Sequence, residues 1–160
     1  MMPIFTKSAR IISPFDDVWN FHSNIDGLEQ LTPAWINLKI KSVVDSKGKQ
    51  IQGNLSEGAK IVVTIHPLKI GSPVIWNIQI LEISKQSSGA FFQDDVSGKP
   101  FQKWIHTHSF SPLGGHTILT DRVDYSLSGL LSRFSILCHP ILWIMFTMRH
   151  YQLNKLLQKD

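Results

Sequence analysis

Residues 91–110, FFQDDVSGKPFQKWIHTHSF, decide the fold that the sequence predicts. Alternate residues of a strand share one face, so a strand over 101–110 points Trp104, His106, His108 and Phe110 to the same side. The residues between them are mostly polar. Because the first set contains two large aromatic rings, we expect it to face a core or cavity. Its two histidines would lie about 6.6 Å apart along the strand.

The following strand, predicted over 117–127, offers matching partners. Asp121, Val123 and Tyr125 share one face, and a hairpin through 113–116 would place Asp121 and Tyr125 beside the histidine row. A buried carboxylate is costly unless it is paired, and a histidine is a natural partner. The sequence therefore predicts a small polar cluster inside an apolar shell, with these members: His106, His108, Asp121, Tyr125 and, as a further candidate, Asp94.

Strand patterns of this kind recur along the chain, separated by polar or glycine-rich turns. Strands are predicted over 5–12, 36–44, 59–66, 74–83, 89–95, 101–110 and 117–127, with short helices over 14–22 and 25–31. Ser13 is the expected N-cap of the first helix and Pro14 its first residue. Short connections favour antiparallel neighbours. The prediction is an α+β fold with a curved, antiparallel, seven-stranded sheet.

The C-terminal segment is predicted to form one long helix over 130–157. Its apolar residues at three- and four-residue spacing form a stripe that the sheet is expected to cover: Leu130, Phe134, Leu137, Ile141, Ile144, Met148 and Tyr151, widened by Leu131, Leu142, Met145 and Phe146. Pro140 is expected to kink the helix. The apolar run over 134–148 is shorter than the roughly 20 residues that span a bilayer. We therefore expect a core helix that the sheet covers, and no transmembrane segment.

Composition limits the classes of function. The 160 residues fit one domain over 1–160, and the net charge of +4 comes from scattered side chains, which argues against a nucleic-acid partner. The single cysteine, Cys138, favours a reducing, cytoplasmic location, and its apolar surroundings predict a buried, inert thiol.

Three uses of the polar cluster remain open. The histidines can serve as structural hydrogen-bond partners of the carboxylates, as anchors for a ligand head group in an apolar cavity, or as catalytic or metal-binding groups. In the last case, His-x-His with a carboxylate could chelate a metal, or a histidine–aspartate pair could act as a general base. His22, His66 and His150 are isolated in the sequence, and we expect them at the surface or at its boundary.

The order of elements and two motifs resemble the helix-grip fold of the START/Bet v-like superfamily, and more closely the bacterial ligand-binding SRPBCC proteins grouped with polyketide cyclases/dehydrases and lipid-transport domains. The middle motif comprises Phe92, Asp94, Pro100, Phe101, Trp104, His106, His108 and Phe110, followed by Asp121, Val123 and Tyr125. The N-terminal motif comprises Ile11, Ser13, Pro14, Val18, Trp19 and Phe21, followed by residues 31–33. Arg149 occupies a position where these proteins tend to carry an arginine. Gly98 and Val96 depart from the pattern.

The resemblance implies a fold and a cavity rather than a reaction. We expect a protein that binds or carries a hydrophobic small molecule (a lipid, sterol or polyketide-like compound) without a cofactor or metal. The expected apolar wall is Trp76, Phe92, Trp104, Phe110, Leu137, Ile141 and Met145, and the expected polar end is Asp94, His106, His108, Asp121 and Tyr125. One alternative is a cyclase/dehydrase-type enzyme that uses His106 or His108 as a proton shuttle. Another is a protein-interaction module with little cavity.

Overall fold

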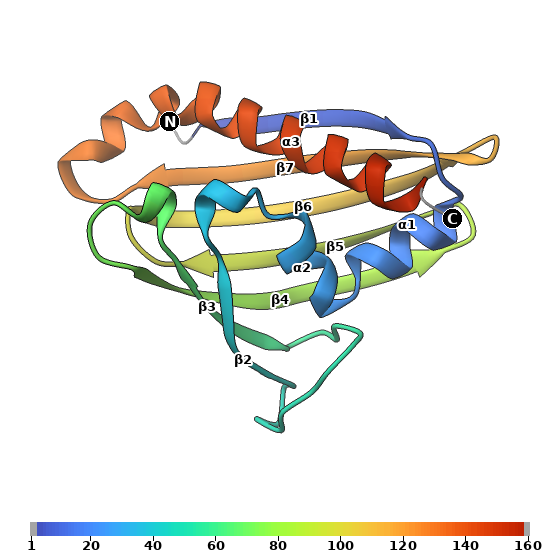
Figure 1. Cartoon of the computed structure of the whole chain (residues 1–160), viewed down its shortest axis with the longest axis horizontal. Helices are drawn as coiled ribbons and strands as arrows, with labels where there is room; N and C mark the ends of the chain where they lie inside the picture. The colour runs from blue at the N-terminus through green and yellow to red at the C-terminus, as the bar shows by residue number, and fades with distance from the viewer. Residues whose placement is uncertain (1–2, 159–160) are drawn as a thin grey trace.

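Seven strands form a single antiparallel sheet in the order β1-β7-β6-β5-β4-β3-β2 in the computed structural model, which describes residues 3–158 (Figure 1). The strands are β1 (Ile4–Ile11), β2 (Lys39–Val44), β3 (Lys60–Ile65), β4 (Val74–Gln86), β5 (Gly89–Ser97), β6 (Phe101–Leu113) and β7 (His116–Leu127). Every neighbouring pair except β1 and β7 is consecutive along the chain. The short connections therefore give antiparallel pairing, as the sequence predicted.

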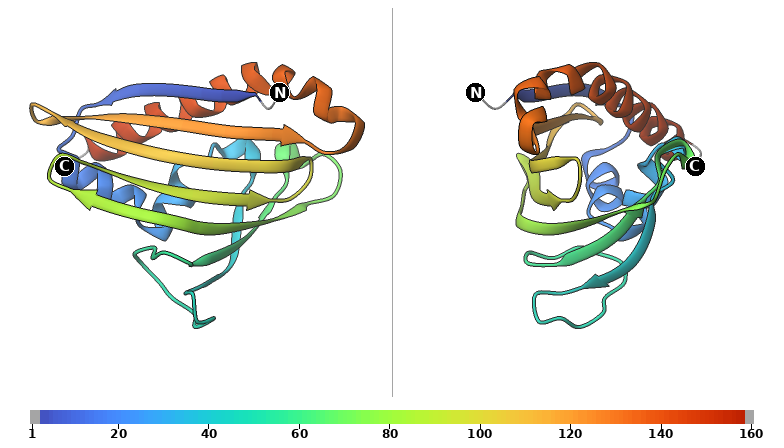
Figure 2. Two further views of the ribbon diagram at one scale, coloured as in Figure 1. Left: turned by 180° about the vertical axis from the view of Figure 1, so that it is seen from behind. Right: turned by 90° about the vertical axis from the view of Figure 1, so that its left-hand side faces the viewer.

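Helices occupy the concave side of this sheet. The α-helices are α1 (Phe15–His22), α2 (Ile25–Leu31) and α3 (His139–Leu157), with 3₁₀ segments η1 (Ala34–Ile36), η2 (Pro67–Lys69) and η3 (Gly129–Cys138). Figure 2 shows the sheet curling around α1 and α2, while α3 runs beside β1. The predicted fold class, a curved seven-stranded sheet with two short helices after the first strand and a long C-terminal helix, is confirmed.

The strand register brings the predicted polar residues together. In the β6–β7 hairpin, His108 is paired with Asp121 and Trp104 with Tyr125, and Asp94 on β5 is paired with His106. Directly opposed residues on one face of a sheet have their Cβ atoms about 5 Å apart. The alternation seen in the sequence therefore becomes a cluster on the concave face.

Two helix starts differ from the sequence prediction. Pro14, not Ser13, is the N-cap of α1, and no side chain caps this helix; Ser13 is buried, and its carbonyl accepts a hydrogen bond from Thr117. The predicted helix over 130–157 is divided into η3 and α3, so Pro140 lies in the first turn of α3. A proline there removes no intrahelical hydrogen bond, and the expected kink in the middle of a helix is wrong.

The inward face of the C-terminal helix was predicted only in part. The seven residues that define the expected stripe are exposed, but two that widen it, Leu142 and Phe146, are buried. His150 and Leu153 complete the buried face. The helix is apolar around most of its circumference, so periodicity offers no clear choice of face. The polar partners of His150 inside the fold fix the rotation instead.

A close approach explains the glycine in the β5–β6 connection. A Cβ atom on Gly98 would lie 2.1 Å from the Trp76 ring and 2.8 Å from the carbonyl oxygen of Ile75. The Trp76 indole crosses this turn and donates a hydrogen bond of 2.9 Å to the carbonyl of Lys99. The turn therefore fixes the orientation of an aromatic side chain that faces the cavity.

Candidate functional site

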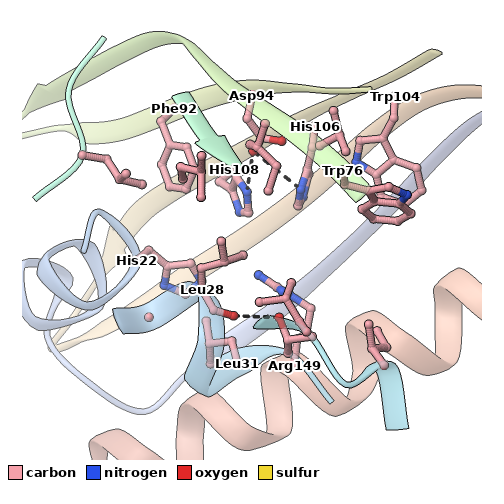
Figure 3. A pocket seen from close by; sticks show the side chains of 18 of the residues that line it. His22, Leu28, Leu31, Trp76, Phe92, Asp94, Trp104, His106, His108 and Arg149 are labelled. Atoms are coloured by element: carbon pink, nitrogen blue, oxygen red, sulfur yellow. Dashed lines mark hydrogen bonds and ion pairs between the residues drawn. The ribbon is translucent and has the colours of Figure 1, made fainter. Parts of the chain in front are cut away.

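A cavity of about 130 Å³ lies between the concave face of the sheet and helices α2 and α3 (Figure 3). Most of its wall is aliphatic or aromatic, and the polar side chains come from both the sheet (Asp94, His106 and His108) and the helices (His22 and Arg149), as Figure 3 shows. The apolar lining includes Leu28, Leu31, Ile36, Leu38, Leu55, Ile61, Ile65, Trp76, Ile78, Ile80, Phe92, Val96, Trp104, Met145 and Phe146. The polar lining comprises His22, Thr32, Asp94, His106, His108 and Arg149.

Asp121 lies behind the histidines and is the centre of the polar cluster. Its Oδ1 accepts a hydrogen bond of 2.9 Å from Nε2 of His106, and its Oδ2 accepts one of 2.5 Å from Nε2 of His150. Nδ1 of His108 lies 2.9 Å from Oδ1, but the contact is not aligned as a hydrogen bond. All four side chains are buried. One carboxylate therefore holds rings from β6 and α3 in place.

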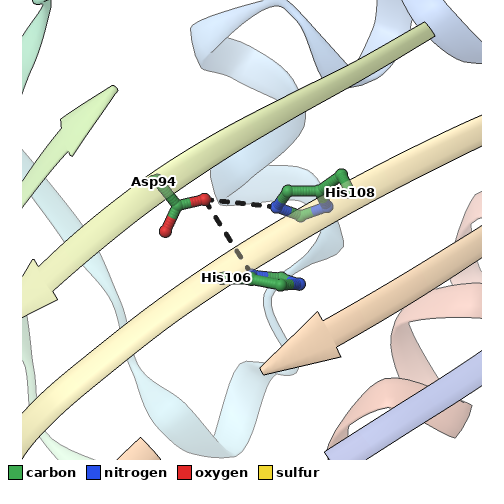
Figure 4. Close-up of side chains that lie close together, drawn as sticks. All are labelled: Asp94, His106 and His108. Carbon is green, nitrogen blue, oxygen red and sulfur yellow. Dashed lines mark ion pairs between the residues drawn. The ribbon is translucent and has the colours of Figure 1, made fainter. Parts of the chain in front are cut away.

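Asp94 approaches the other side of the same two rings (Figure 4). Its Oδ2 lies 3.3 Å from Nε2 of His108 and 3.9 Å from Nδ1 of His106. The ring centroids of His106 and His108 are 3.7 Å apart. His108 thus lies between two carboxylates, whereas His106 has a close, aligned bond to only one of them.

These contacts shift the pKa values in opposite directions. Burial raises the pKa of Asp121, but its contacts with three histidines outweigh this effect and hold it well below its usual range. Burial and the neighbouring His108 lower the pKa of His106. Burial also lowers the pKa of His108, yet its contacts with Asp121 and Asp94 prevail and raise it. The cluster therefore favours a neutral His106 beside a protonated His108.

His22 closes the polar side of the cavity from α1. Burial, reinforced by the nearby His108, lowers the pKa of His22 to about 3. A neutral ring at ordinary pH is consistent with its contact of 3.2 Å with the Val18 carbonyl, to which Nδ1 donates. His22 therefore offers a neutral ring nitrogen, rather than a charge, to the cavity.

Arg149 extends from α3, and Figure 3 shows its guanidinium pointing into the cavity. Burial lowers the pKa of Arg149, while Asp121 and Asp94 act in the opposite direction. Within residues 3–158 it forms no ion pair at 4.0 Å or less. An arginine stays charged at ordinary pH and carries five donors, so the cavity wall has hydrogen-bond donors to offer.

The structure separates the predicted ligand-contacting residues into three groups. Seven line the cavity: Trp76, Phe92, Asp94, Trp104, His106, His108 and Met145. Phe110, Asp121 and Tyr125 are buried behind this layer. Leu137 and Ile141 point outward, so their expected place in the cavity wall is wrong, for the reason given above for the rotation of α3. Phe146 and Arg149 occupy that part of the wall instead.

Sequence reasoning missed His22 and His150 as members of the site, and it noted Arg149 only through the family resemblance, without a place in the cavity. The expectation that His22 and His150 lie at the surface or its boundary is wrong, because both are buried. One signal was present: His150 follows Leu142 and Phe146 at four-residue steps, and His22 follows Val18 in the same way. Such spacing places a residue on the face of its apolar neighbours.

Tyr125 and Cys138 have structural surroundings. The Tyr125 hydroxyl donates to Nδ1 of His139 at 2.6 Å, because the other ring nitrogen of His139 is positioned to donate to the Ile4 carbonyl. Burial raises the pKa of Tyr125 to about 12. Cys138 is half-buried rather than fully buried, and burial raises the pKa of its thiol. Neither group is tuned for proton transfer near neutral pH.

The cluster also has the donor set of a metal site. Asp94, His106 and His108 each offer one ligand atom, and these atoms lie within 4.8 Å of one another. Asp121 contacts the opposite ring nitrogens, as outer carboxylates do in histidine metal sites. Two histidines and a carboxylate suit several divalent transition metals, so these three residues could hold an ion in place of the proton on His108.

No protein-family model matches the sequence, and no curated protein matches it. Solved structures are similar over nearly the whole chain. Protein CV1439 from Chromobacterium violaceum has a TM-score of 0.69 at 12% identity, covering 99% of both chains. Norcoclaurine synthase from Thalictrum flavum has a TM-score of 0.67 at 12% identity, covering 100% of this chain and 96% of that one.

A START superfamily protein from Mycobacterium smegmatis is similar to the same degree, with a TM-score of 0.67 at 12% identity, covering 98% of this chain and 97% of that one. The chain therefore has the helix-grip fold of the START/Bet v-like superfamily, as the resemblance implied. At these identities the likeness establishes the fold. The ligand and any reaction must be argued from the site.

Proposed function

We propose that this helix-grip protein binds a hydrophobic small molecule in the cavity between the sheet and helices α2 and α3. One observation carries the proposal: a cavity whose wall is mostly apolar and includes a few buried polar side chains. Small-molecule sites have this composition, in which apolar walls supply affinity and a few polar groups fix the orientation. For the polar end of the ligand, Arg149 is a hydrogen-bond donor, and the unprotonated ring nitrogen of His22 is an acceptor.

The size of the cavity restricts the ligand. The volume of about 130 Å³ is close to that of an apolar cavity that accommodates a benzene ring. A single ring or a short aliphatic stretch therefore fits without rearrangement, and a longer lipid, sterol or polyketide-like ligand would extend out of this partly open cavity. Trp76, Phe92 and Trp104 provide flat surfaces against which a ring can stack.

The test is native mass spectrometry after gentle purification, followed by exposure to fatty acids, sterols and aromatic polyketides. We expect a Leu28→Trp variant to lose ligand uptake, because Leu28 lines the cavity and the larger ring would fill it. Glu29→Trp is the matched control, since the neighbouring side chain is exposed and does not line the cavity. A wild-type protein that is isolated empty and takes up none of these compounds would refute the proposal.

A second function, general acid–base catalysis of the cyclase/dehydrase type, is favoured by the opposed pKa shifts of His106 and His108. Adjacent titratable groups whose surroundings separate their pKa values can supply a base and an acid at one pH. His106 would accept a proton, and protonated His108 would donate one. Asp121 would orient both rings from behind, as a carboxylate does for a catalytic histidine.

Histidine titration by NMR tests this second function. We expect the His108 ring to titrate above the usual pKa of about 6.5 and the His106 ring below it, with His22 remaining neutral until about pH 3. If the protein takes up ligand but the pKa values of His106 and His108 are not separated, the binding function is supported and the catalytic function is refuted. Rings that all titrate like free histidine would count against the acid–base assignment.

A further inference from the structure

The outer side of the C-terminal segment carries an unusually apolar surface. We call it the outer face, and it consists of Leu130, Leu131, Phe134, Ile136, Leu137, Ile141, Trp143, Ile144, Met148 and Tyr151, all exposed. Leu130 is 85% exposed, and Leu137 and Tyr151 are about two-thirds exposed. Soluble monomers rarely expose a contiguous apolar patch of more than a few hundred Å² unless it binds something. An apolar surface of this kind marks a site of interaction with a protein or a membrane.

The helical run that carries the outer face has the composition of a membrane segment. Gly129–Leu157 is long and apolar enough to cross a bilayer, with a mean hydropathy of 1.5, but only 17% of that apolar window is buried. The inner side of α3 is committed to the fold, because Leu142, Phe146, His150 and Leu153 pack against the sheet and the polar cluster. Spanning a bilayer would break these contacts, whereas lying on one would not.

The charged side chains of the segment that carries the outer face, and of the adjoining strand β1, are all basic. Segments 4–11 and 129–157 contain no Asp or Glu, and their basic residues outside the cavity wall are Lys7, Arg10, Arg133 and Lys155. The Lys7 ammonium lies 4.5 Å from the centre of the Trp143 ring, and the Arg133 guanidinium lies 4.8 Å from that of Phe134. An apolar surface edged by cations complements an anionic lipid surface.

Two aromatic residues on the outer face suit the boundary between lipid and water. Trp143 and Tyr151, two turns apart on α3, each combine a large apolar ring with a polar group and are more than half exposed. Such side chains are enriched where the acyl region meets the head groups. The outer face thus has apolar, aromatic and basic components in the combination typical of helices that lie in a membrane interface.

The outer face reaches the wall of the cavity. Met145 lines the cavity, and its helical neighbours Ile141 and Met148 are exposed on the outer face. Residues three and four apart are adjacent on a helix, so the two apolar surfaces meet at Met145. A molecule dissolved in a bilayer under the outer face would be separated from the cavity by about the width of α3.

We propose that the outer face docks the protein on an anionic membrane surface, with α3 and η3 lying in the plane of the interface. A second copy of the chain is a poorer occupant. A two-fold symmetric contact places the same patch against itself, so it would bring two acid-free, basic surfaces together. Lipid head groups of opposite charge complement the same surface. The proposal does not depend on the identity of the cavity ligand.

Flotation with lipid vesicles tests the proposal. We expect the full chain to bind vesicles of phosphatidylcholine mixed with phosphatidylglycerol, and to bind more weakly to phosphatidylcholine alone or at high salt. A Leu137→Ser/Ile144→Ser variant should bind the mixed vesicles roughly tenfold more weakly, because two large apolar contacts with lipid are lost. Both residues are exposed and neither lines the cavity.

Matched controls separate lipid docking from other effects. Ile75→Ser/Leu113→Ser replaces two exposed apolar residues on strands β4 and β6 and should keep wild-type vesicle binding. Arg133→Gln should weaken binding to the mixed vesicles and reduce its salt dependence. Unchanged cavity-ligand uptake by the Leu137→Ser/Ile144→Ser variant would show that docking and cavity binding are separate properties.

Three outcomes would overturn the proposal. The first is absence of flotation with either vesicle type. The second is equal weakening by the outer-face and control double variants. The third is a wild-type dimer in sedimentation that does not float and that Leu137→Ser/Ile144→Ser converts to a monomer, because the occupant of the outer face would then be a second copy of the chain.

Discussion

Asp121 is the residue on which the interior cluster depends. It contacts three buried histidines, so its negative charge is compensated only while all three rings stay in place. Removing one partner of a buried charged pair leaves an uncompensated group and costs about 3–5 kcal/mol. The two carboxylates are further balanced by the protonated His108 and by Arg149, which extends into the same space. The cluster is thus close to neutral as a unit.

Replacing Asp121 with asparagine should lower the free energy of unfolding by about 3 kcal/mol. The amide lacks the negative charge and leaves at least one histidine N–H without an acceptor. Urea unfolding at pH 7 measures the change. Asp124→Asn is the control, since Asp124 pairs with the half-exposed Arg122, and an exposed pair contributes at most about 1 kcal/mol. Equal losses in the two variants would contradict the central role of Asp121.

At the scale of elements, the residue at which α3 begins decides which side chains of the C-terminal segment are buried and which are exposed. The helix begins at His139, after ten residues of 3₁₀ structure. Long 3₁₀ runs are uncommon, because their hydrogen-bond geometry is poorer than that of an α-helix. The hydroxyl of Ser135, a buried residue in this segment, accepts a hydrogen bond from the backbone N–H of Leu127. This bond ties η3 to the end of β7.

Replacing Pro140 with alanine should change the free energy of unfolding by less than about 1 kcal/mol, because a first-turn proline removes no helical hydrogen bond. The matched variant Ile144→Pro places the same ring inside α3 and should cost about 3 kcal/mol or more. Thermal unfolding followed by circular dichroism measures both. A marked gain in stability for Pro140→Ala would mean that the proline interrupts a longer helix after all.

For the whole molecule, the buried histidines make stability depend on pH. A histidine whose pKa is lowered by folding binds its proton more readily in the unfolded chain, so its contribution is complete above about pH 6.5 and is lost as the pH falls. His22 and His106 act in this direction. Asp121 adds stability that is lost only at a lower pH, below the carboxyl range. The raised pKa of His108 has the opposite sign, and its contribution disappears as the pH rises through that pKa.

We therefore expect the free energy of unfolding to decrease as the pH falls from 6.5 to 4, with a contribution from His22 of up to about 3 kcal/mol. Because the pKa of His22 lies near 3, His22→Gln should remove that part of the slope. Guanidinium unfolding at a series of pH values gives both curves. A variant curve parallel to that of the wild type would show that the His22 ring gains its proton without a folding penalty.

The sequence determined most of the sheet and the facing of its strands. Strand alternation has a period of two and opposes polar to apolar residues, so Trp104, His106 and His108 could be assigned to the concave face from the chain alone. Short turns then placed Asp121 beside them. The structure confirmed this part of the cluster.

Only the tertiary structure decided the rotation of α3 and the remaining members of the site. A helix that is apolar on nearly every side has no periodic signal to identify its inner face. Its rotation is fixed by the bond from His150 to Asp121 and by the packing of Phe146 under the sheet. Those contacts join residues far apart in the chain. They bring Arg149 to the cavity and leave Leu137 and Ile141, the expected cavity wall, on the outer face.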